Sequence, residues 1–375
     1  MISLVPFSFS SQLIPIKQLL SPYTHRAYLV GGSVRDLLLN NEPSDLDIEV
    51  YDVLPQQFDL LMQKAGADGV GKSYFVYKLD ELDLSLPRTE NKVGVGHKAF
   101  EVNYCNNELQ ASARRDFTIN SIMLNIFTGE LLDLHGGVRD LENGVIRHVN
   151  SEKFAEDSLR ILRGVRFASK FGFKIAPETI EFMKTLSLRD ISKDRIGNEL
   201  IKIFKTKHQD IGVKYLQELD LFKELFSLSL SYEEAQDFGK RVKQAFAITR
   251  DPRQFLYLLH GMFGLSDEVL ENLRLPNDFR ACFRQPFGGS GVSKAMLLKM
   301  AFAMPIREWL GANTPQVVKL AKELGVYDKS MRDLDIYVDG NEVVRDGFTG
   351  AAVGGEIRKR QDEIVEQILE GRIKI

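Results

Sequence analysis

The chain has 375 residues, of which 44% are hydrophobic and 27% charged, and its net charge at pH 7 is −3. This balance is typical of a soluble globular protein, and the length predicts two to four domains. No apolar stretch is long enough to span a bilayer, and the N-terminal stretch lacks the basic start of a secretory signal. We therefore expect a cytoplasmic protein.

Cysteine and charge patterns narrow the class further. Cys105 and Cys282 lie far apart and form no CxxC, which argues against a disulfide framework and a zinc site. The negative net charge argues weakly against nucleic acid, but positive charge can be local. Basic residues cluster at 114–115, 160–166, 240–243 and 358–360. Taken alone, each cluster is better explained as a solvated face than as an RNA site.

The first 149 residues alternate strand-like and helical patterns. Apolar runs predict strands at 27–30, 45–51, 75–79, 82–86, 119–125 and 131–133, and residues 60–66 look helical. This order predicts an α/β or α+β head built on one small mixed sheet. Residues 87–112 are polar and contain Gly94 and Gly96, which predicts a long mobile connection.

From Ser151 onward the pattern becomes helical, with a period of 3.6 residues. Ser151 could cap one helix and Pro177 could open another. The run FGGSGV at 287–292 predicts a break, and a Gly-rich stretch at 346–355 leads into a charged helix at 356–370. We predict an elongated all-helical remainder, with a head at 1–149, a neck at 150–205, a body at 206–300 and a tail at 301–375.

Two glycines end the first predicted strand. Gly31 and Gly32 let the backbone approach a phosphate, a helix N-terminus favours anions, and Arg35 adds a bidentate donor. Taken alone, the same residues fit an ordinary strand-to-helix turn with a surface arginine at least as well.

Two carboxylates follow on the next predicted strand. Asp45 and Asp47 point to the same face because successive strand residues alternate, while Leu46 and Ile48 point into the core. Beside a glycine turn, such a pair suits two Mg²⁺ ions and a triphosphate. Asp83, on a later strand, could be a metal ligand, the base for an attacking hydroxyl, or a strand-edge aspartate.

These patterns, taken with three further motifs, resemble the class II tRNA nucleotidyltransferases, the CCA-adding enzymes of the polymerase β-like superfamily. The match covers residues 20–205, and the rest is similar only in helical character and in a Gly-rich tail. In chain order the motifs are GGSVRD at 31–36 with DLD at 45–47, RRDFTIN at 114–120, DLHGGVRDL at 133–141, EDSLRILRGVRF at 156–167, and Arg195, Glu199 and Lys202 in the spacing RxxxExxK.

The resemblance implies an enzyme that adds C, C and A to the 3′ end of tRNA from CTP and ATP, with release of pyrophosphate. It implies that Asp45 and Asp47 hold two Mg²⁺ ions, and that Asp83 assists catalysis. It also implies that Arg195, Glu199 and Lys202 brace the nucleotide-binding helix. The implied nucleotide-binding residues are Gly32, Arg35, Arg115, Asp116, Asn120, Asp157, Arg160, Arg163 and Arg166.

The fourth motif has a physical reading of its own. On one helix, Asp157, Arg160, Arg163 and Arg166 would form a polar stripe. The apolar residues beside it would anchor the helix in the core; they are Leu159, Leu162 and Val165. An aspartate accepts from the amino group of cytosine or adenine, and an arginine donates to the adjacent ring nitrogen. Uracil and guanine present the reverse order and would leave polar groups unpaired. The alternative is an i, i+3 surface salt bridge between Asp157 and Arg160.

Residues 86–102 resemble the flexible loop of enzymes that add all three nucleotides, and His97 fits a loop or RNA contact better than a metal ligand. Residues 111–113 are Ala-Ser-Ala, where the family often has an acidic residue. No histidine is followed by Asp, so we expect no appended phosphohydrolase. We expect the body and tail to grip the acceptor and T-arm of tRNA, and nothing implies a protein partner or a membrane. The alternatives are a CC-only or A-only enzyme, a poly(A) polymerase, and an inactive RNA-binding relative.

Overall fold

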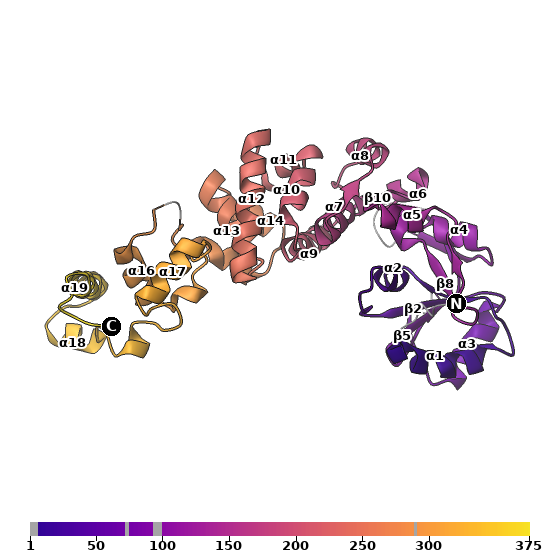
Figure 1. The fold of residues 1–375 in the computed structure, drawn as a ribbon, viewed down its shortest axis with the longest axis horizontal. Coiled ribbons are helices and arrows are strands. Elements are labelled where there is room, and N and C mark those ends of the chain that lie inside the picture. Colours follow the sequence, from indigo (N-terminus) through magenta and orange to yellow (C-terminus); the bar gives the residue numbers. More distant parts are fainter. Residues whose placement is uncertain (1–6, 72–74, 93–99, 289–290) are drawn as a thin grey trace. The chain divides into compact units, whose positions relative to one another are not determined.

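The computed structural model describes residues 7–71, 75–92, 100–288 and 291–375 (Figure 1). The chain forms two compact units, Met1–Ile196 and Gly197–Ile375, called here the first and the second unit. Within the described ranges, no helix is both long enough and apolar enough to cross a membrane.

A mixed seven-stranded sheet forms the centre of the first unit. Its order is β3-β4-β5-β2-β1-β8-β9, and the β2–β5 pair is parallel, whereas its other pairs are antiparallel. The strands are β1 (Ala27–Val30), β2 (Leu46–Val50), β3 (Asp68–Gly71), β4 (Val76–Leu79), β5 (Leu82–Ser85), β8 (Met123–Asn125) and β9 (Leu131–Leu132). The prediction of a mixed-sheet head followed by a helical chain is confirmed.

Two details of the predicted sheet are wrong. The expected strand at 119–125 is shorter, because its first part is the 3-10 turn η2 (Thr118–Asn120) and only β8 pairs with β1. The sequence also gave no signal for β3, whose residues DGVG contain two glycines and so lack strand propensity.

Alternation along the strands separates a core face from a polar face. Leu29, Ile48 and Leu84 are fully buried on one face, and Asp47 and Glu49 occupy the other. In Figure 1, α2 (Gly32–Leu38) lies on one side of β2 and β5, and α1 (Phe7–Leu20) and α3 (Pro55–Lys64) lie on the other. Apolar side chains of α1 and α3 are buried, among them Leu13, Ile16, Phe58 and Met62.

The stretch expected to be a long connection contains regular structure. β6 (Arg88–Lys92) and β7 (Phe100–Tyr104) form an antiparallel ribbon, and α4 (Glu108–Ala113) follows it. The prediction of a long connection over 87–112 is therefore wrong in its extent, because backbone pairing forms two strands from these polar segments. Gly94, Gly96 and His97 lie outside the described residues.

The rest of the first unit is mainly helical. It contains α5 (Gly137–Glu142), α6 (Ser151–Ala155), α7 (Arg160–Phe171), α8 (Pro177–Lys184) and the parallel pair β10 (Val145–Ile146) and β11 (Lys174–Ile175). Pro177 opens α8, as predicted. The predicted cap of α6 is wrong by one residue, because the side chain of Asn150 accepts from the Lys153 amide and Ser151 is already helical. The first unit ends within α9 (Lys193–Phe204).

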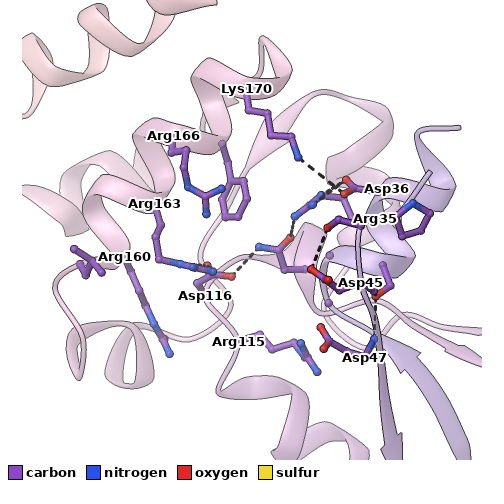
Figure 2. Close-up of a pocket in the computed structure, with 18 of the residues that line it drawn as sticks. Arg35, Asp36, Asp45, Asp47, Arg115, Asp116, Arg160, Arg163, Arg166 and Lys170 are labelled. Carbon is purple, nitrogen blue, oxygen red and sulfur yellow. Dashed lines mark hydrogen bonds and ion pairs between the residues drawn. The ribbon is translucent and has the colours of Figure 1, made fainter. Parts of the chain in front are cut away.

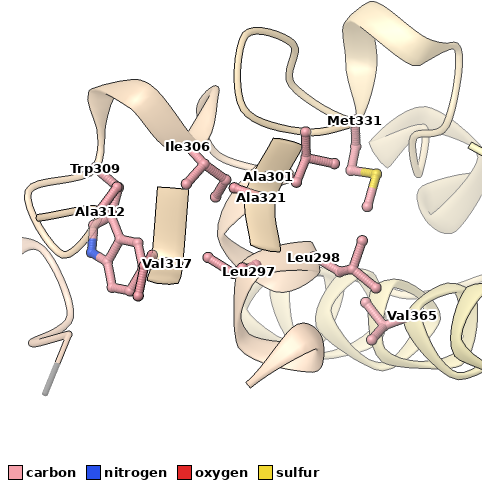
Figure 3. Close-up of a cluster of buried hydrophobic side chains, with 11 residues drawn as sticks. Leu297, Leu298, Ala301, Ile306, Trp309, Ala312, Val317, Ala321, Met331 and Val365 are labelled. Atoms are coloured by element: carbon pink, nitrogen blue, oxygen red, sulfur yellow. The ribbon is translucent and has the colours of Figure 1, made fainter. Parts of the chain in front are cut away.

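In its described residues, the second unit is built from helices. They are α10 (Gln209–Glu218), α11 (Leu221–Phe226), α12 (Tyr232–Thr249), α13 (Gln254–Phe263), α14 (Asp267–Asn272), α15 (Asn277–Ala281), η3 (Cys282–Arg284), α16 (Lys294–Ala301), η4 (Ile306–Glu308), α17 (Pro315–Glu323), η5 (Arg332–Leu334), α18 (Gly340–Arg345) and α19 (Ala351–Leu369). Figure 3 shows one of its cores, in which Leu298, Trp309 and Met331 are fully buried and Val365 of α19 is nearly so.

The last helix begins earlier than predicted. α19 starts at Ala351 after Gly350, whose φ of +56° ends the preceding turn, so Gly354 and Gly355 lie inside the helix rather than at its start. A helix tolerates glycine at a cost of roughly 1 kcal/mol each, which the packing of Val365 helps to offset. The division into head, neck, body and tail stays a prediction.

Candidate active site

A cavity of about 550 Å³ opens in the first unit between the β1–α2 turn, the start of β2, the segment 114–120 and α7 (Figure 2). Eight of its lining side chains are Arg or Lys and five are Asp, so the site suits a polyanion. Of the residues expected from the sequence, Asp83 lies outside this lining. The others that line it are Gly32, Arg35, Asp45, Asp47, Arg115, Asp116, Asn120, Asp157, Arg160, Arg163 and Arg166.

The turn between β1 and α2 requires glycine. Gly31 has φ +72°, and a Cβ atom there would lie 2.9 Å from Nη1 of Arg115 and 3.8 Å from Oδ2 of Asp47. A side chain at Gly31 would therefore strain the backbone and displace Arg115. A Cβ atom at Gly32 would lie 3.3 Å from Nη2 of Arg35. Both glycines therefore let guanidinium groups approach the main chain.

Ser33 connects this turn to the acidic strand. Its Oγ donates to the carbonyl of Asp45 at 3.0 Å and accepts from the amide of Asp47 at 3.3 Å. Asp45 is exposed just before β2, Asp47 is partly buried within it, and Leu46 between them is buried. The predicted alternation along this strand is confirmed, and Ser33 is a positioning contact that the sequence did not reveal.

Asp83 stands beside Asp47 on the neighbouring strand. The parallel β2–β5 register pairs Asp47 with Asp83, so their side chains lie on the same face of the sheet. Burial raises the pKa of Asp47 above its usual value, Arg115 opposes this, and the charges of Asp83, Asp45 and Glu49 raise the pKa further. Within the described part of the chain, no three His, Cys, Asp or Glu residues are grouped so that they could hold a metal ion.

Glu49 follows Asp45 and Asp47 on the same strand face, and the sequence analysis missed it. Its side chain is 1% exposed, and its Oε1 accepts from Nη2 of Arg114 at 2.7 Å and from Nη2 of Arg115 at 3.2 Å. Burial alone would raise the pKa of Glu49, but the two guanidinium groups lower it. The signal was present as a third acidic residue at the same two-residue spacing.

Asp116 connects the cationic helix to the glycine turn. It is buried; its Oδ2 accepts from Nε of Arg163 at 2.7 Å, and its Oδ1 accepts from Nδ2 of Asn120 at 2.8 Å. Asn120 in turn accepts from Nη1 of Arg35 at 2.6 Å. Burial opposes ionisation of Asp116, but Arg163 and Asn120 lower its pKa overall. One chain of polar contacts thus runs from α7 to α2 (Figure 2).

Aromatic rings support the cations at the far end of the cavity. The guanidinium of Arg166 lies 4.2 Å from the ring centre of Phe167, and that of Arg35 lies 4.9 Å from the ring centre of Phe171. Arg35 also pairs with Asp36 at 2.8 Å, and Nζ of Lys170 lies 4.0 Å from the same carboxylate. Asp36 and Lys170 line the cavity and were not among the residues expected from the sequence.

The predicted polar stripe is wrong at its first member. Asp157 lies in the turn before α7, where its Oδ2 pairs with Nη2 of Arg195 at 2.8 Å, whereas Arg160 is the first residue of the helix. Arg160 donates to the carbonyls of Lys153 at 2.8 Å and Arg114 at 2.7 Å. The expected core anchors of this segment, Leu159, Leu162 and Val165, are buried.

The motif at 133–141 does not line the cavity but packs against a segment that does. The carboxylate of Asp133 accepts from the amides of Gly137 and Val138 at 2.7 and 2.9 Å and so caps α5. Gly137 packs against the carbonyl of Thr118 so closely that a Cβ would overlap it. This close packing holds η2, which carries Asn120.

The chain is similar in sequence and in structure to known proteins. Residues 27–147 match the family described as "Poly A polymerase head domain", and residues 172–231 match the one described as "Probable RNA and SrmB- binding site of polymerase A". The chain is also similar to the crystal structure of the Bacillus stearothermophilus CCA-adding enzyme in complex with CTP, with a TM-score of 0.68, 22% identity, and coverage of 98% of this chain and 94% of that one. Residues 27–147 are thus similar to the poly A polymerase head domain, and the chain has the fold of the solved CCA-adding enzymes.

Further relatives agree with this assignment. The Thermotoga maritima CCA-adding enzyme complexed with tRNA_CCA aligns with a TM-score of 0.66 and 20% identity over 100% of this chain and 94% of that one. The "Multifunctional CCA protein" of Acinetobacter baumannii strain SDF is 36% identical over 213 residues, which are 54% of this chain and 50% of the relative. That of Nitrosospira multiformis is 38% identical over 192 residues, which are 49% of this chain and 45% of the relative. The chain thus spans about half the length of the curated relatives it matches, and the resemblance inferred from its motifs is confirmed.

Proposed function

We propose that this protein adds C, C and A, without a template, to the 3′ end of tRNA, using CTP and ATP and releasing pyrophosphate. The observation that carries the proposal is the cavity itself, which brings the glycine turn and the carboxylates of β2 together with the arginines of α7. A triphosphate needs a cationic surface, and a nucleobase needs paired hydrogen-bond donors and acceptors. The names of the relatives, which refer to CCA addition, CTP and tRNA, support the same reaction.

The donor set fits Mg²⁺. Carboxylate oxygens are the ligands this ion prefers, and Asp45 and Asp47 supply them from one strand face. The neighbouring carboxylates that raise the pKa of Asp47 also favour a divalent cation over an empty site. Asp45 and Asp47 would hold two ions, with Asp83 as a further ligand or as the base for the attacking hydroxyl. When bound, the ions stabilise the charges that develop on the attacking and leaving oxygens.

Cationic side chains would bind the triphosphate. Arg115 projects towards Gly31 and Asp47, and its Nη1 faces the glycine turn, so this guanidinium can donate to an anion bound there. Arg35 and Gly32, both in α2, line the same part of the cavity. Arg163 and Arg166 add positive charge from α7, opposite the turn (Figure 2). Asp116 and Asn120 would orient Arg163 and Arg35 near the ribose.

Asp157 and Arg160 would select the base. Arg160 uses two of its five N–H groups on main-chain carbonyls, which fixes its plane and leaves donors for a ring nitrogen. Asp157 is held by Arg195 and by the amide of Leu159, and a carboxylate can accept further bonds. The pair would accept cytosine and adenine, while uracil and guanine would leave buried polar groups unpaired.

The remaining chain would bind the tRNA. We assign the neck, 150–205, to the nucleotide base, and the body and tail, 206–300 and 301–375, to the acceptor and T-arm, recognised by shape and phosphate contacts. We propose a cytoplasmic location, which agrees with a tRNA substrate.

The test uses tRNA transcripts ending before CCA, after C and after CC, each incubated with Mg²⁺ and with CTP, ATP or both, and resolved at single-nucleotide resolution. We expect the first transcript to grow by CCA and stop, and the Asp47→Asn variant to add nothing. Growth by CC alone, or of the CC-ended transcript alone, would indicate a CC-only or A-only enzyme. Long adenylate tails would indicate a poly(A) polymerase, and no growth in any reaction would leave an inactive RNA-binding relative.

A further inference from the structure

The buried end of the acidic strand face carries a charge that the proposed reaction does not use. Asp45, Asp47 and Glu49 alternate along one face of β2, and exposure falls along this series until the Glu49 side chain is 1% exposed. An isolated buried carboxylate is strongly unfavourable unless opposite charges and hydrogen bonds compensate it. The partners of Glu49 therefore indicate its role.

Those partners are two consecutive arginines at the end of α4. Nη2 of Arg114 and Nη2 of Arg115 both donate to Oε1 of Glu49, at 2.7 and 3.2 Å, and the hydroxyl of Tyr51 donates to Oε2 at 3.1 Å. Arg114 and Arg115 both line the cavity. One buried carboxylate therefore fixes the side chains of two cavity residues.

Each arginine extends this restraint to a different end of the cavity. Arg115 is held beside Gly31 and Asp47, where the triphosphate is expected to bind. The main-chain carbonyl of Arg114 accepts from Nη2 of Arg160 at 2.7 Å, and Arg160 is the residue expected to meet the base. Glu49 is thus linked to the triphosphate end of the cavity by Arg115 and to the base end by Arg114.

We propose that Glu49 is a positioning residue for the incoming nucleotide, acting directly on Arg115 and through Arg114 on Arg160. The inference rests on the function proposed above, since it concerns how the same cavity binds CTP and ATP. Without the Glu49 carboxylate, Arg115 loses its anchor. The remaining negative charge of Asp47 then attracts the Arg115 guanidinium, so its N–H donors turn away from the triphosphate. Glu49 itself need not touch the nucleotide.

The chain offers a matched control in the same unit. Glu108 also binds an arginine, accepting from Nε and Nη2 of Arg26 at 2.9 and 2.7 Å, and its side chain is 17% exposed. Arg26 and Glu108 stand outside the lining of the cavity. Glu108→Gln therefore removes a carboxylate from an Arg–Glu pair without altering the nucleotide site.

The test measures CTP binding by calorimetry in the absence of tRNA, so that it does not depend on transfer. The proteins are the wild type, Glu49→Gln, Arg115→Ala, their double variant and Glu108→Gln. We expect Glu49→Gln to raise the Kd for CTP by roughly 10- to 100-fold, as for loss of a charge-assisted contact, and Glu108→Gln to leave it within about twofold. In the Arg115→Ala background, Glu49→Gln should add little, because its main effect passes through Arg115.

Equal effects of Glu49→Gln with and without Arg115, or an unchanged Kd, would overturn the inference. If Glu49→Gln does not fold, Glu49→Asp keeps the charge with a shorter reach. A wild-type Kd and melting temperature for Glu49→Asp would then count against the positioning role, and a raised Kd at an unchanged melting temperature would support it. Failure of the wild type to extend tRNA would refute the proposed function separately, because CTP binding is measured without tRNA.

Discussion

Removal of the Asp157 carboxylate tests the base-selecting pair. We expect Asp157→Ala to relax the choice between CTP and UTP on a transcript ending before CCA. The carboxylate is the acceptor proposed for the amino group of cytosine, and it would repel the carbonyl oxygen that uracil presents at the same position. Its loss therefore weakens the correct substrate and removes a penalty from the wrong one.

The structure sets the size of this effect. A hydrogen bond to a charged group contributes about 1.5–3 kcal/mol, and an unpaired group costs a similar amount. The Asp157 side chain is 25% exposed, so water replaces part of the lost contact, and we take the lower part of that range, about 1.5–2 kcal/mol. The lost contact alone corresponds to a loss of roughly 10- to 30-fold in kcat/KM for CTP, and relief of the penalty on UTP lowers the CTP/UTP ratio further.

The assay is single-nucleotide extension with CTP or UTP as the only nucleotide, with Glu156→Ala as the control. Glu156 is the adjacent acidic residue, pairs with Lys153 at 2.9 Å, and stands outside the cavity lining. We expect the control to keep the wild-type ratio. If Asp157→Ala lowers extension with CTP and UTP by the same factor, the reasoning on base selection is refuted.

Three further changes test other parts of the site. Asp47→Asn should abolish transfer without lowering the melting temperature, because burial and neighbouring carboxylates already disfavour the Asp47 charge; wild-type turnover would contradict its role. Gly31→Ala should cost about 1–3 kcal/mol in backbone strain and should also weaken CTP binding, because the new Cβ displaces Arg115. The control is Gly66→Ala, which is also at positive φ but in open space and should cause the strain alone. Equal CTP affinity in the two variants would count against the displacement of Arg115. Asp116→Asn should lower the free energy of unfolding by about 2–3 kcal/mol at pH 7, less than for a fully buried pair because Arg163 is partly exposed. Because the folded pKa of Asp116 is lowered, the difference from wild type should narrow as the pH falls through and below the ordinary value of 3.8, and a difference that is constant with pH would refute this.

Much of the first unit follows from the sequence because its signals are local. The period-2 pattern located β1, β2, β4 and β5 to within one residue at each end, and the motifs identified most residues of the cavity lining. Asp45 and Asp47 could be assigned to one face because alternation is a geometric property of every strand.

The errors arose where distant parts of the chain decide the outcome. Glu49 belongs to the site only because Arg114 and Arg115 reach it from another segment, which no local pattern reveals. Asp157 has helical spacing from Arg160, but it lies in a turn before the helix, where it pairs with Arg195. The ribbon of β6 and β7 forms by pairing of two polar segments, whose composition resembles that of a loop.

The most direct test of the central claim is to sequence the 3′ ends formed on a tRNA transcript lacking CCA, with Mg²⁺ and all four nucleoside triphosphates at equal concentrations. Competition among the four nucleotides tests the reaction and the base choice together. We expect one dominant product that carries CCA and is not extended further. Ends of CC, long runs of A, or mixed bases at the first added position would contradict the account.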